Sequence, residues 1–124
     1  MTIQNTQKQV GFAVATDASV KDATFIKVAK TTDIPVGVMK HFEVDGLLIL
    51  IANVGDKFYA VCDKCPHLSA MLSKGTLNDS IITCPRHFSS FDVTTGRAIS
   101  GTRSNLQTYV LKLDGNDLLI ERYY

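Results

Sequence analysis

From about residue 24 onward, apolar and polar residues alternate with the two-residue period of β-strands. The segment TFIKVAK at 24–30 alternates in this way, and 39–62 reads as three strands joined by turns at Asp45-Gly46 and Gly55-Asp56. No ten-residue segment keeps the 3.6-residue apolar period of an amphipathic helix. The pattern therefore predicts a chain built from strands.

Three further strand signals follow in the second half of the chain. SIITC at 80–84 ends on a cysteine, SSFDVTTGRAIS at 89–100 predicts a hairpin turning near Thr95-Gly96, and 106–123 predicts another turning at Asp114-Gly115-Asn116. Short strands at this spacing favour an all-β fold, a small antiparallel β-sandwich or partial barrel.

Length and composition fit one domain preceded by an extension. The chain has 124 residues, enough for a single core. Residues 1–23 are rich in Thr, Gln, Asp and Lys and read as an N-terminal extension, in which QVGFAVA at 9–15 could add one strand. We therefore place the domain at 24–124.

Charge and hydropathy exclude several functional classes. With 13 basic and 12 acidic side chains, the net charge of +1 gives no electrostatic reason to expect nucleic acid or an anionic membrane surface. The longest apolar run, LLILIANV at 47–54, is too short to span a bilayer, and the polar N-terminus does not resemble a secretory signal. We therefore expect a cytoplasmic protein.

Cysteine and histidine cluster in two places between predicted strands. Cys65-x-His67 is followed, after 16 residues, by Cys84-x-x-His87, in a chain with only three cysteines and three histidines. Three cysteines cannot all pair in disulfides, so metal binding or thiol chemistry is the expected role. Two short loops of this kind can converge on one site if strands hold their ends together.

Two kinds of metal site suit two cysteines and two histidines. One is a tetrahedral zinc site. The other is a [2Fe–2S] cluster in which two histidines replace two cysteines on one iron. Ligand identity does not separate them, but each pair here mixes one cysteine with one histidine, whereas zinc sites usually pair like with like. The mixed spacing favours the cluster.

The two motifs, CPH at 65–67 and CPRH at 84–87, resemble the Rieske iron–sulfur motif, and the resemblance extends over roughly residues 24–124. It implies a Rieske-like β-sandwich or partial barrel with a small cluster-binding subdomain formed by two loops, 62–75 and 84–92.

The same resemblance implies one [2Fe–2S] cluster per chain and its ligands. Cys65 and Cys84 would bind the buried iron as thiolates. His67 and His87 would bind the outer iron through imidazole nitrogen.

The positions around the motifs resemble those of the soluble Rieske ferredoxins. Respiratory relatives have a disulfide between the loops, and Ala70 and Arg86 occupy those positions here. Ser89 matches a serine that donates a hydrogen bond to a bridging sulfide in those relatives, while Phe91 replaces a tyrosine. The resemblance therefore implies a reduction potential in the lower half of the Rieske range.

Two other residues near the motifs have plainer interpretations. Cys62 forms a Cys62-x-x-Cys65 pair, which is also a spacing of redox dithiols, but a small buried residue at the end of a strand is favoured. His41, between charged neighbours on a predicted strand, is expected at the surface.

The sequence shows no catalytic base or substrate pocket beside the expected cluster. We expect a monomeric one-electron carrier and not an enzyme; by resemblance it would take electrons from a reductase and pass them to a terminal oxygenase or another redox partner. One alternative is a Rieske-like small subunit of a nitrite reductase or similar complex. Another is a zinc-stabilised binding module, which would be colourless where the iron protein is red-brown.

Overall fold

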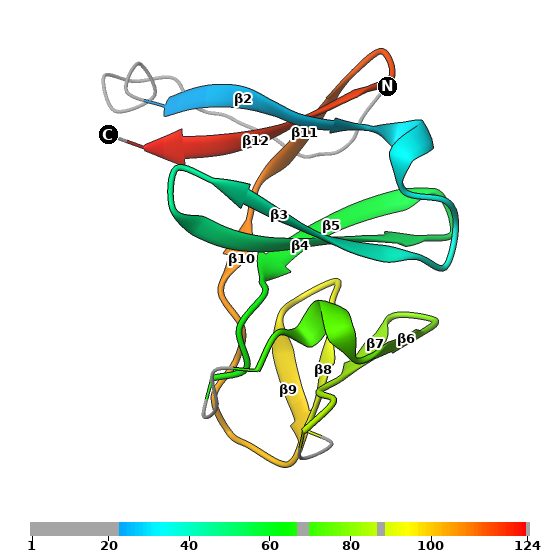
Figure 1. The fold of residues 1–124 in the computed structure, drawn as a ribbon, viewed down its shortest axis with the longest axis vertical. Coiled ribbons are helices and arrows are strands. Elements are labelled where there is room, and N and C mark those ends of the chain that lie inside the picture. Colours follow the sequence, from blue (N-terminus) through cyan, green and yellow to red (C-terminus); the bar gives the residue numbers. More distant parts are fainter. Residues whose placement is uncertain (1–22, 67–69, 87–88, 124) are drawn as a thin grey trace. The chain divides into compact units, whose positions relative to one another are not determined.

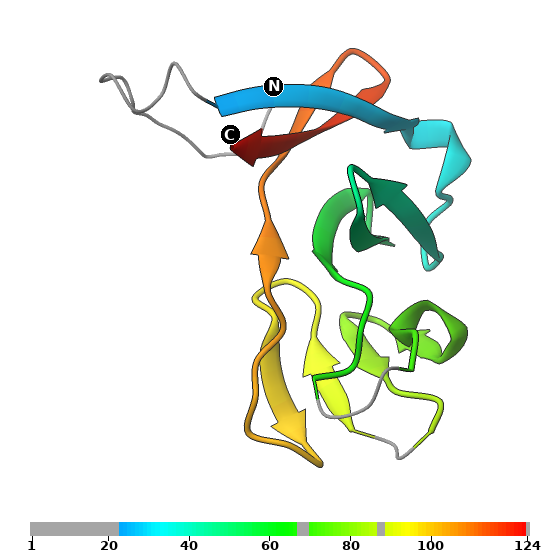
Figure 2. The same cartoon turned by 60° about the vertical axis from the view of Figure 1, so that its left-hand side comes forward.

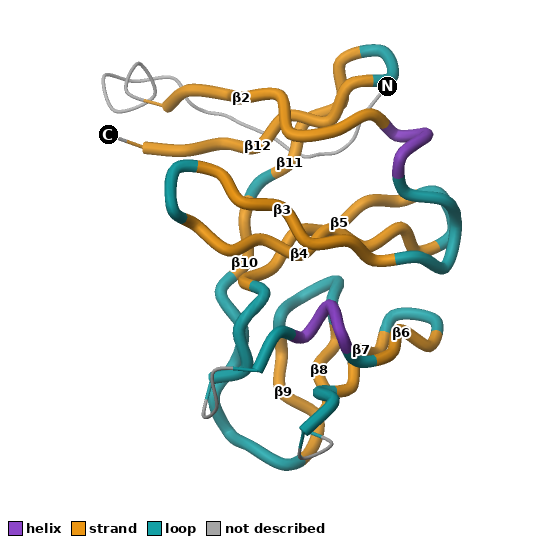
Figure 3. The backbone as a smooth tube through the Cα atoms, viewed as in Figure 1, coloured by secondary structure: helices purple, strands orange, loops and turns teal. Residues whose placement is uncertain are grey.

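The computed structural model describes residues 23–66, 70–86 and 89–123. In these residues the chain forms antiparallel strands and two short 3₁₀ turns, orange and purple in Figure 3. The expected antiparallel all-β class is confirmed. The N-terminal extension, including the possible strand at 9–15, lies outside the described residues. The described part contains no helix with the length and apolar character needed to cross a membrane.

The chain divides into two compact units, and each is described here by itself. The first comprises residues up to Asp33 together with Val110–Tyr124. It is one antiparallel sheet with strand order β11-β12-β2. Its elements are β2 (Ala23–Lys30), η3 (Thr31–Asp33), β11 (Leu111–Asp114) and β12 (Asp117–Tyr123).

The second unit, Ile34–Tyr109, contains two four-stranded sheets. The sheet of order β10-β5-β4-β3 is built from β3 (Met39–Val44), β4 (Leu47–Val54), β5 (Lys57–Cys62) and β10 (Thr108–Tyr109). The sheet of order β6-β7-β8-β9 is built from β6 (Thr76–Asn78), β7 (Ile81–Thr83), β8 (Ser90–Asp92) and β9 (Arg97–Ser100), and η4 (Leu72–Lys74) precedes it. The chain leaves the first sheet after β5, forms the second, and returns to β10 (Figures 1 and 2).

Tight turns set the register of the first sheet. Asp45-Gly46 and Gly55-Asp56 join β3 to β4 and β4 to β5, and all four residues have positive φ. Two-residue turns of this conformation match the twist of paired strands, and glycine and aspartate tolerate it well. Both turns are the ones the sequence predicts.

The longest apolar run of the sequence, 47–54, is the inner strand β4. Five consecutive residues, Ile49 to Asn53, are buried, so both faces of the strand are covered. A strand covered on both faces does not alternate, which explains the continuous run. Asn53 is hydrogen-bonded: its Nδ2 donates to the Ile34 carbonyl at 2.8 Å, and its Oδ1 accepts from the Asp56 N–H at 2.8 Å.

The predicted hairpin at 106–123 is only partly right. Residues 111–123 form the hairpin of β11 and β12, with Asp114 opposite Asp117 around the predicted turn. The residues before Val110 form β10, which pairs with β5 in the other unit's sheet. An alternating sequence predicts extended backbone, but it does not say which strand each half of the segment pairs with.

One hydrophobic cluster joins the two sheets of the second unit. Its buried members are Leu50, Ala52, Val61, Cys65, Leu72, Ile82, Cys84, Phe91, Val93 and Leu106. The first three come from β4 and β5, and most of the others come from the second sheet and its loops. Both expected cysteine ligands therefore lie in the core that holds the sheets together.

Two glycines allow loops of the second unit to approach each other closely. A Cβ on Gly75 would lie 1.9 Å from the Thr83 carbonyl oxygen and 3.1 Å from Pro85 Cδ. A Cβ on Gly101, which has φ of +82°, would lie 2.5 Å from Ser89 Oγ. Side chains at either position would separate the segments that surround the expected metal centre.

This packing predicts a large effect for Gly101→Ala. Gly115 also has positive φ, but a Cβ there meets nothing within 4 Å, so Gly115→Ala is a matched control for backbone strain alone. Left-handed backbone costs an alanine about 1–2 kcal/mol. Gly101→Ala should lose a further ~1–3 kcal/mol, because overpacking forces Ser89 to move.

Urea unfolding of the two cluster-loaded variants, each compared with the parent, measures this difference. Equal losses of unfolding free energy would show that Gly101 is needed only for its backbone conformation and that Ser89 is not displaced.

Candidate metal centre

The first candidate ligand loop runs from the end of β5 to η4. Cys65 is 1% exposed, and its backbone N–H donates to the Ala70 carbonyl at 3.0 Å. Leu72, fully buried at the start of η4, fixes the far end of the loop in the core. His67 falls within the span that the Cys65–Ala70 bond closes, but residues 67–69 lie outside the described part of the chain.

The second candidate loop joins β7 to β8. Cys84 is fully buried, and its backbone N–H donates to the Ser89 carbonyl at 2.8 Å. Thr83 and Ser90, on either side of the loop, are paired in the β7–β8 ladder. His87 lies within the closed span and, with residue 88, is outside the described residues.

The two loops are closed in the same way. In each, a cysteine N–H bonds to the carbonyl five residues further on, and the expected histidine lies between. Both cysteines belong to one hydrophobic cluster, and Gly75 brings the loops into contact at Thr83 and Pro85. The described half of the candidate centre is therefore a pair of buried thiol groups on two similar, touching loops.

The predicted site residues can be compared with the structure only in part. Cys65 and Cys84 lie in one buried hydrophobic cluster. The positions of His67 and His87 are not described, so the set of four ligands stays a prediction. For this reason no group of three potential metal-binding side chains appears within the described residues. The three cysteines, all of which are described, form no disulfide, in agreement with Ala70 and Arg86 at the positions of the respiratory bridge.

A third segment beside the centre was not predicted from sequence. Residues 101–107 follow β9. Gly101 touches Ser89, which is fully buried.

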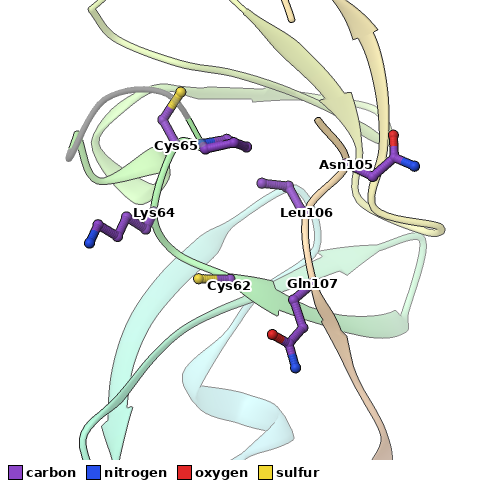
Figure 4. A pocket seen from close by; sticks show the side chains of 7 residues that line it. Cys62, Lys64, Cys65, Asn105, Leu106 and Gln107 are labelled. Carbon is purple, nitrogen blue, oxygen red and sulfur yellow. The ribbon is translucent and has the colours of Figure 1, made fainter. Parts of the chain in front are cut away.

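A pocket of about 270 Å³ lies between this segment and the first loop. It is lined by Asn105, Leu106 and Gln107 from the segment and by Cys62, Lys64, Cys65 and Pro66 from the end of β5 and the first loop. In Figure 4 the Leu106 side chain points toward the first loop, whereas Lys64 points away from the pocket. The only signal for this segment in the sequence is Gly101, and a single glycine does not reveal which residue it approaches.

Cys62 is half-buried at the end of β5, so the expectation of a small buried residue is only partly right. Its N–H donates to the Gln107 carbonyl at 2.9 Å, and its sulfur lies apart from that of Cys65 in Figure 4. Burial raises the pKa of Tyr109, and the neighbouring Cys62 raises it further through its charge and a hydrogen bond. This arrangement gives no support to a Cys62–Cys65 dithiol.

The expectation for His41 is only partly right, because its side chain is 30% exposed but has a buried partner. Its ring is not an independent surface group: Nδ1 lies 2.6 Å from Oδ2 of the fully buried Asp63. The sequence did not indicate this pair, because its members are 22 residues apart and lie on different elements.

Comparisons with known proteins agree with the motif. The model of the Rieske [2Fe-2S] domain family matches residues 24–110. The ferredoxin component of biphenyl 2,3-dioxygenase from Rhodococcus jostii (strain RHA1) is 38% identical over 96 residues, which cover 77% of this chain and 90% of that protein.

Solved structures show the same relationship. The ferredoxin of carbazole 1,9a-dioxygenase from Nocardioides aromaticivorans IC177 superimposes with a TM-score of 0.74 at 32% identity, covering 78% of this chain and 96% of that one. A chain from a complex of reduced oxygenase and oxidized ferredoxin in carbazole 1,9a-dioxygenase gives 0.73 at 31% identity, covering 77% and 91%. The chain belongs to the Rieske [2Fe-2S] domain family, and it is an electron carrier that holds a Rieske-type cluster and has no catalytic reaction of its own.

Proposed function

We propose that Cys65, His67, Cys84 and His87 bind the [2Fe–2S] cluster, with the cysteines on the inner iron and the histidines on the outer iron. The observation that carries this assignment is the matching closure of the two loops around buried Cys65 and Cys84. The two motifs place a histidine two residues after Cys65 and three residues after Cys84, within the span that each loop closes.

The residues present fit the cluster. Two thiols, 1% and 0% exposed and in no disulfide, are the donor groups that iron–sulfur clusters require. When bound, the cluster supplies reversible one-electron chemistry. Leu72, Phe91 and Leu106 exclude water from the cysteine side, and the absence of water strengthens every electrostatic interaction there.

We further propose that the protein carries electrons between a reductase and a terminal oxygenase, as a cytoplasmic monomer. Support comes from the relatives, which are named as ferredoxin components of dioxygenases, one of them in complex with its oxygenase. The zinc-module alternative is set aside, because the matched family binds a [2Fe–2S] cluster. The alternative of a nitrite reductase small subunit has the support of the shared fold alone: a putative nitrite reductase NADPH (small subunit) superimposes with a TM-score of 0.67 at 18% identity, covering 78% of this chain and 97% of that one.

The ligand assignment predicts that Cys65→Ser and His87→Ala each abolish the Rieske spectrum. The parent protein should hold about two irons and two sulfides per chain. Cys62→Ser is the matched control, because Cys62 lies three residues from Cys65 but outside the proposed ligand set, and it should keep full iron and colour.

Iron and acid-labile sulfide analysis, with electron paramagnetic resonance of the reduced protein, measures these outcomes. Full cluster content in Cys65→Ser, or loss of the cluster in Cys62→Ser, would contradict the assignment.

Exposed charges around the proposed ligand loops have one sign. The cations are Lys64, Lys74, Arg86 and Arg103, all exposed. The only acidic residue in segments 63–75, 84–90 and 100–107 is Asp63, and it is fully buried. With 13 basic and 12 acidic side chains in the chain, the surface beside the cluster is more positive than the rest. We therefore propose an acidic docking surface on the redox partner, since opposite charges steer association.

This charge distribution predicts that a small anionic oxidant, ferricyanide, reacts faster at low salt than at high salt, while cationic hexaammineruthenium(III) shows the reverse trend. The double variant Lys64→Gln/Arg86→Gln should lower the ferricyanide rate several-fold at low salt, because it removes cations beside the electron's exit.

Lys40→Gln/Lys57→Gln is the control of equal charge change. Both lysines are exposed, on β3 and at the start of β5, and Lys57 is separated from the first loop by the length of that strand. Stopped-flow oxidation of the reduced proteins measures the rates. Equal effects of the two double variants would mean that only net charge matters and that the loops present no docking surface.

A further inference from the structure

Asp63, at the start of the first ligand loop, is a carboxylate with no exposed surface. Burial of a carboxylate is costly unless polar partners replace the lost water. Here the partners come from two other elements. The Ser73 N–H donates to Oδ1 at 2.7 Å, the Ser73 hydroxyl donates to Oδ2 at 2.5 Å, and His41 Nδ1 lies 2.6 Å from Oδ2.

The two side-chain partners of Asp63 belong to η4 and to strand β3. Ser73 is in η4, near the far end of the first ligand loop, so its contact with Asp63 joins the two sides of the segment 64–72, which contains Cys65. His41 is on β3, the edge strand of the first sheet, and η4 packs against this strand. The Asp63 N–H itself donates to the Leu48 carbonyl of β4 at 2.9 Å. One side chain thus fastens both ends of the loop to the sheet.

The two ends of the second ligand loop are joined by strand pairing and do not need a buried carboxylate to hold them. Its ends are held by the β7–β8 ladder, in which Thr83 faces Ser90. The first loop instead leads from β5 of one sheet to η4 before the other, and these two elements do not pair. Asp63 performs for the first loop the closure that strand pairing performs for the second.

We infer that Asp63 is a positioning residue for the cluster, acting through Ser73 and His41 to hold the first ligand loop closed on the sheet. The inference rests on the proposed ligand assignment, because Cys65, the proposed ligand described in this loop, lies between the two ends that Asp63 and Ser73 join. A positioning role also accounts for the residue type: an apolar side chain could fill the same buried space, but it could not bind the N–H and hydroxyl of Ser73 and the ring of His41 at once.

The test compares cluster retention in Asp63→Asn, Ser73→Ala and Ser73→Thr. Each protein, loaded with cluster, is incubated with an iron chelator well below its unfolding temperature, and decay of the visible circular dichroism is followed. Hydrogen bonds to charged groups are worth roughly a factor of ten in equilibrium constant. We therefore expect roughly ten-fold faster cluster loss for Ser73→Ala, at least as much for Asp63→Asn, and near-parent retention for Ser73→Thr, which keeps the hydroxyl.

The matched control is Thr94→Ala. Thr94 Oγ1 donates to Asp92 Oδ1 at 2.7 Å, a hydroxyl–carboxylate bond of the same kind in the β8–β9 turn. Its loss should leave the cluster decay rate at the parent value, even if the melting temperature falls. The paramagnetic resonance line shape and the reduction potential should change in Asp63→Asn and Ser73→Ala and not in Thr94→Ala, because only the first two move a ligand loop.

Parent-like decay, line shape and potential in both Asp63→Asn and Ser73→Ala would overturn the inference, and a lower melting temperature alone would then assign Asp63 to general stability. This failure is distinct from a failure of the ligand assignment, in which Cys65→Ser itself would keep the cluster.

Discussion

The contact between the two ligand loops limits how the rest of the second unit is built. Gly75 lies so close to the Thr83 carbonyl that no side chain fits between them, and Pro85 packs beside it. Cys65 and Cys84 are nineteen residues apart in sequence but lie in one hydrophobic cluster. The close approach of Gly75 to Thr83 brings the two segments that carry these cysteines together. The short antiparallel strands β6 and β7 connect the first ligand loop to the second. The hydrophobic cluster includes the cysteines of both loops.

The cysteines of the proposed centre are buried, whereas the described residues next to the histidines in sequence are exposed. The cysteine side lies in the same apolar cluster as β4 and β5, so it is fixed by packing that also joins the sheets. Exposed Pro66, Pro85 and Arg86 adjoin the histidine positions in sequence. An electron carrier needs this division, because the cysteine ligands require a rigid, dry environment while the electron must leave toward a partner at the surface.

The sequence predicts the parts of this structure that depend on neighbouring residues. The turns at Asp45-Gly46 and Gly55-Asp56 are encoded by residues that accept positive φ, and the strands around them follow from alternation. The two Cys/His motifs are likewise short-range patterns. By contrast, the pairing of β10 with β5, the contact of Gly101 with Ser89 and the bond between His41 and Asp63 join distant segments. Each depends on which elements the finished fold brings together, and that information is absent from local composition.

The two-residue turns of the first sheet also determine where the chain tolerates changes in length. A one-residue insertion in the Gly55-Asp56 turn would shift β5 against β4, and side chains on β5 would move to the opposite face. Asp63 follows β5 directly, so its carboxylate would then turn away from His41 and Ser73. Loop grafting and sequence drift in this fold should therefore spare these turns and concentrate where neither strand register nor Asp63 depends on length, such as the exposed Gly115-Asn116 turn between β11 and β12.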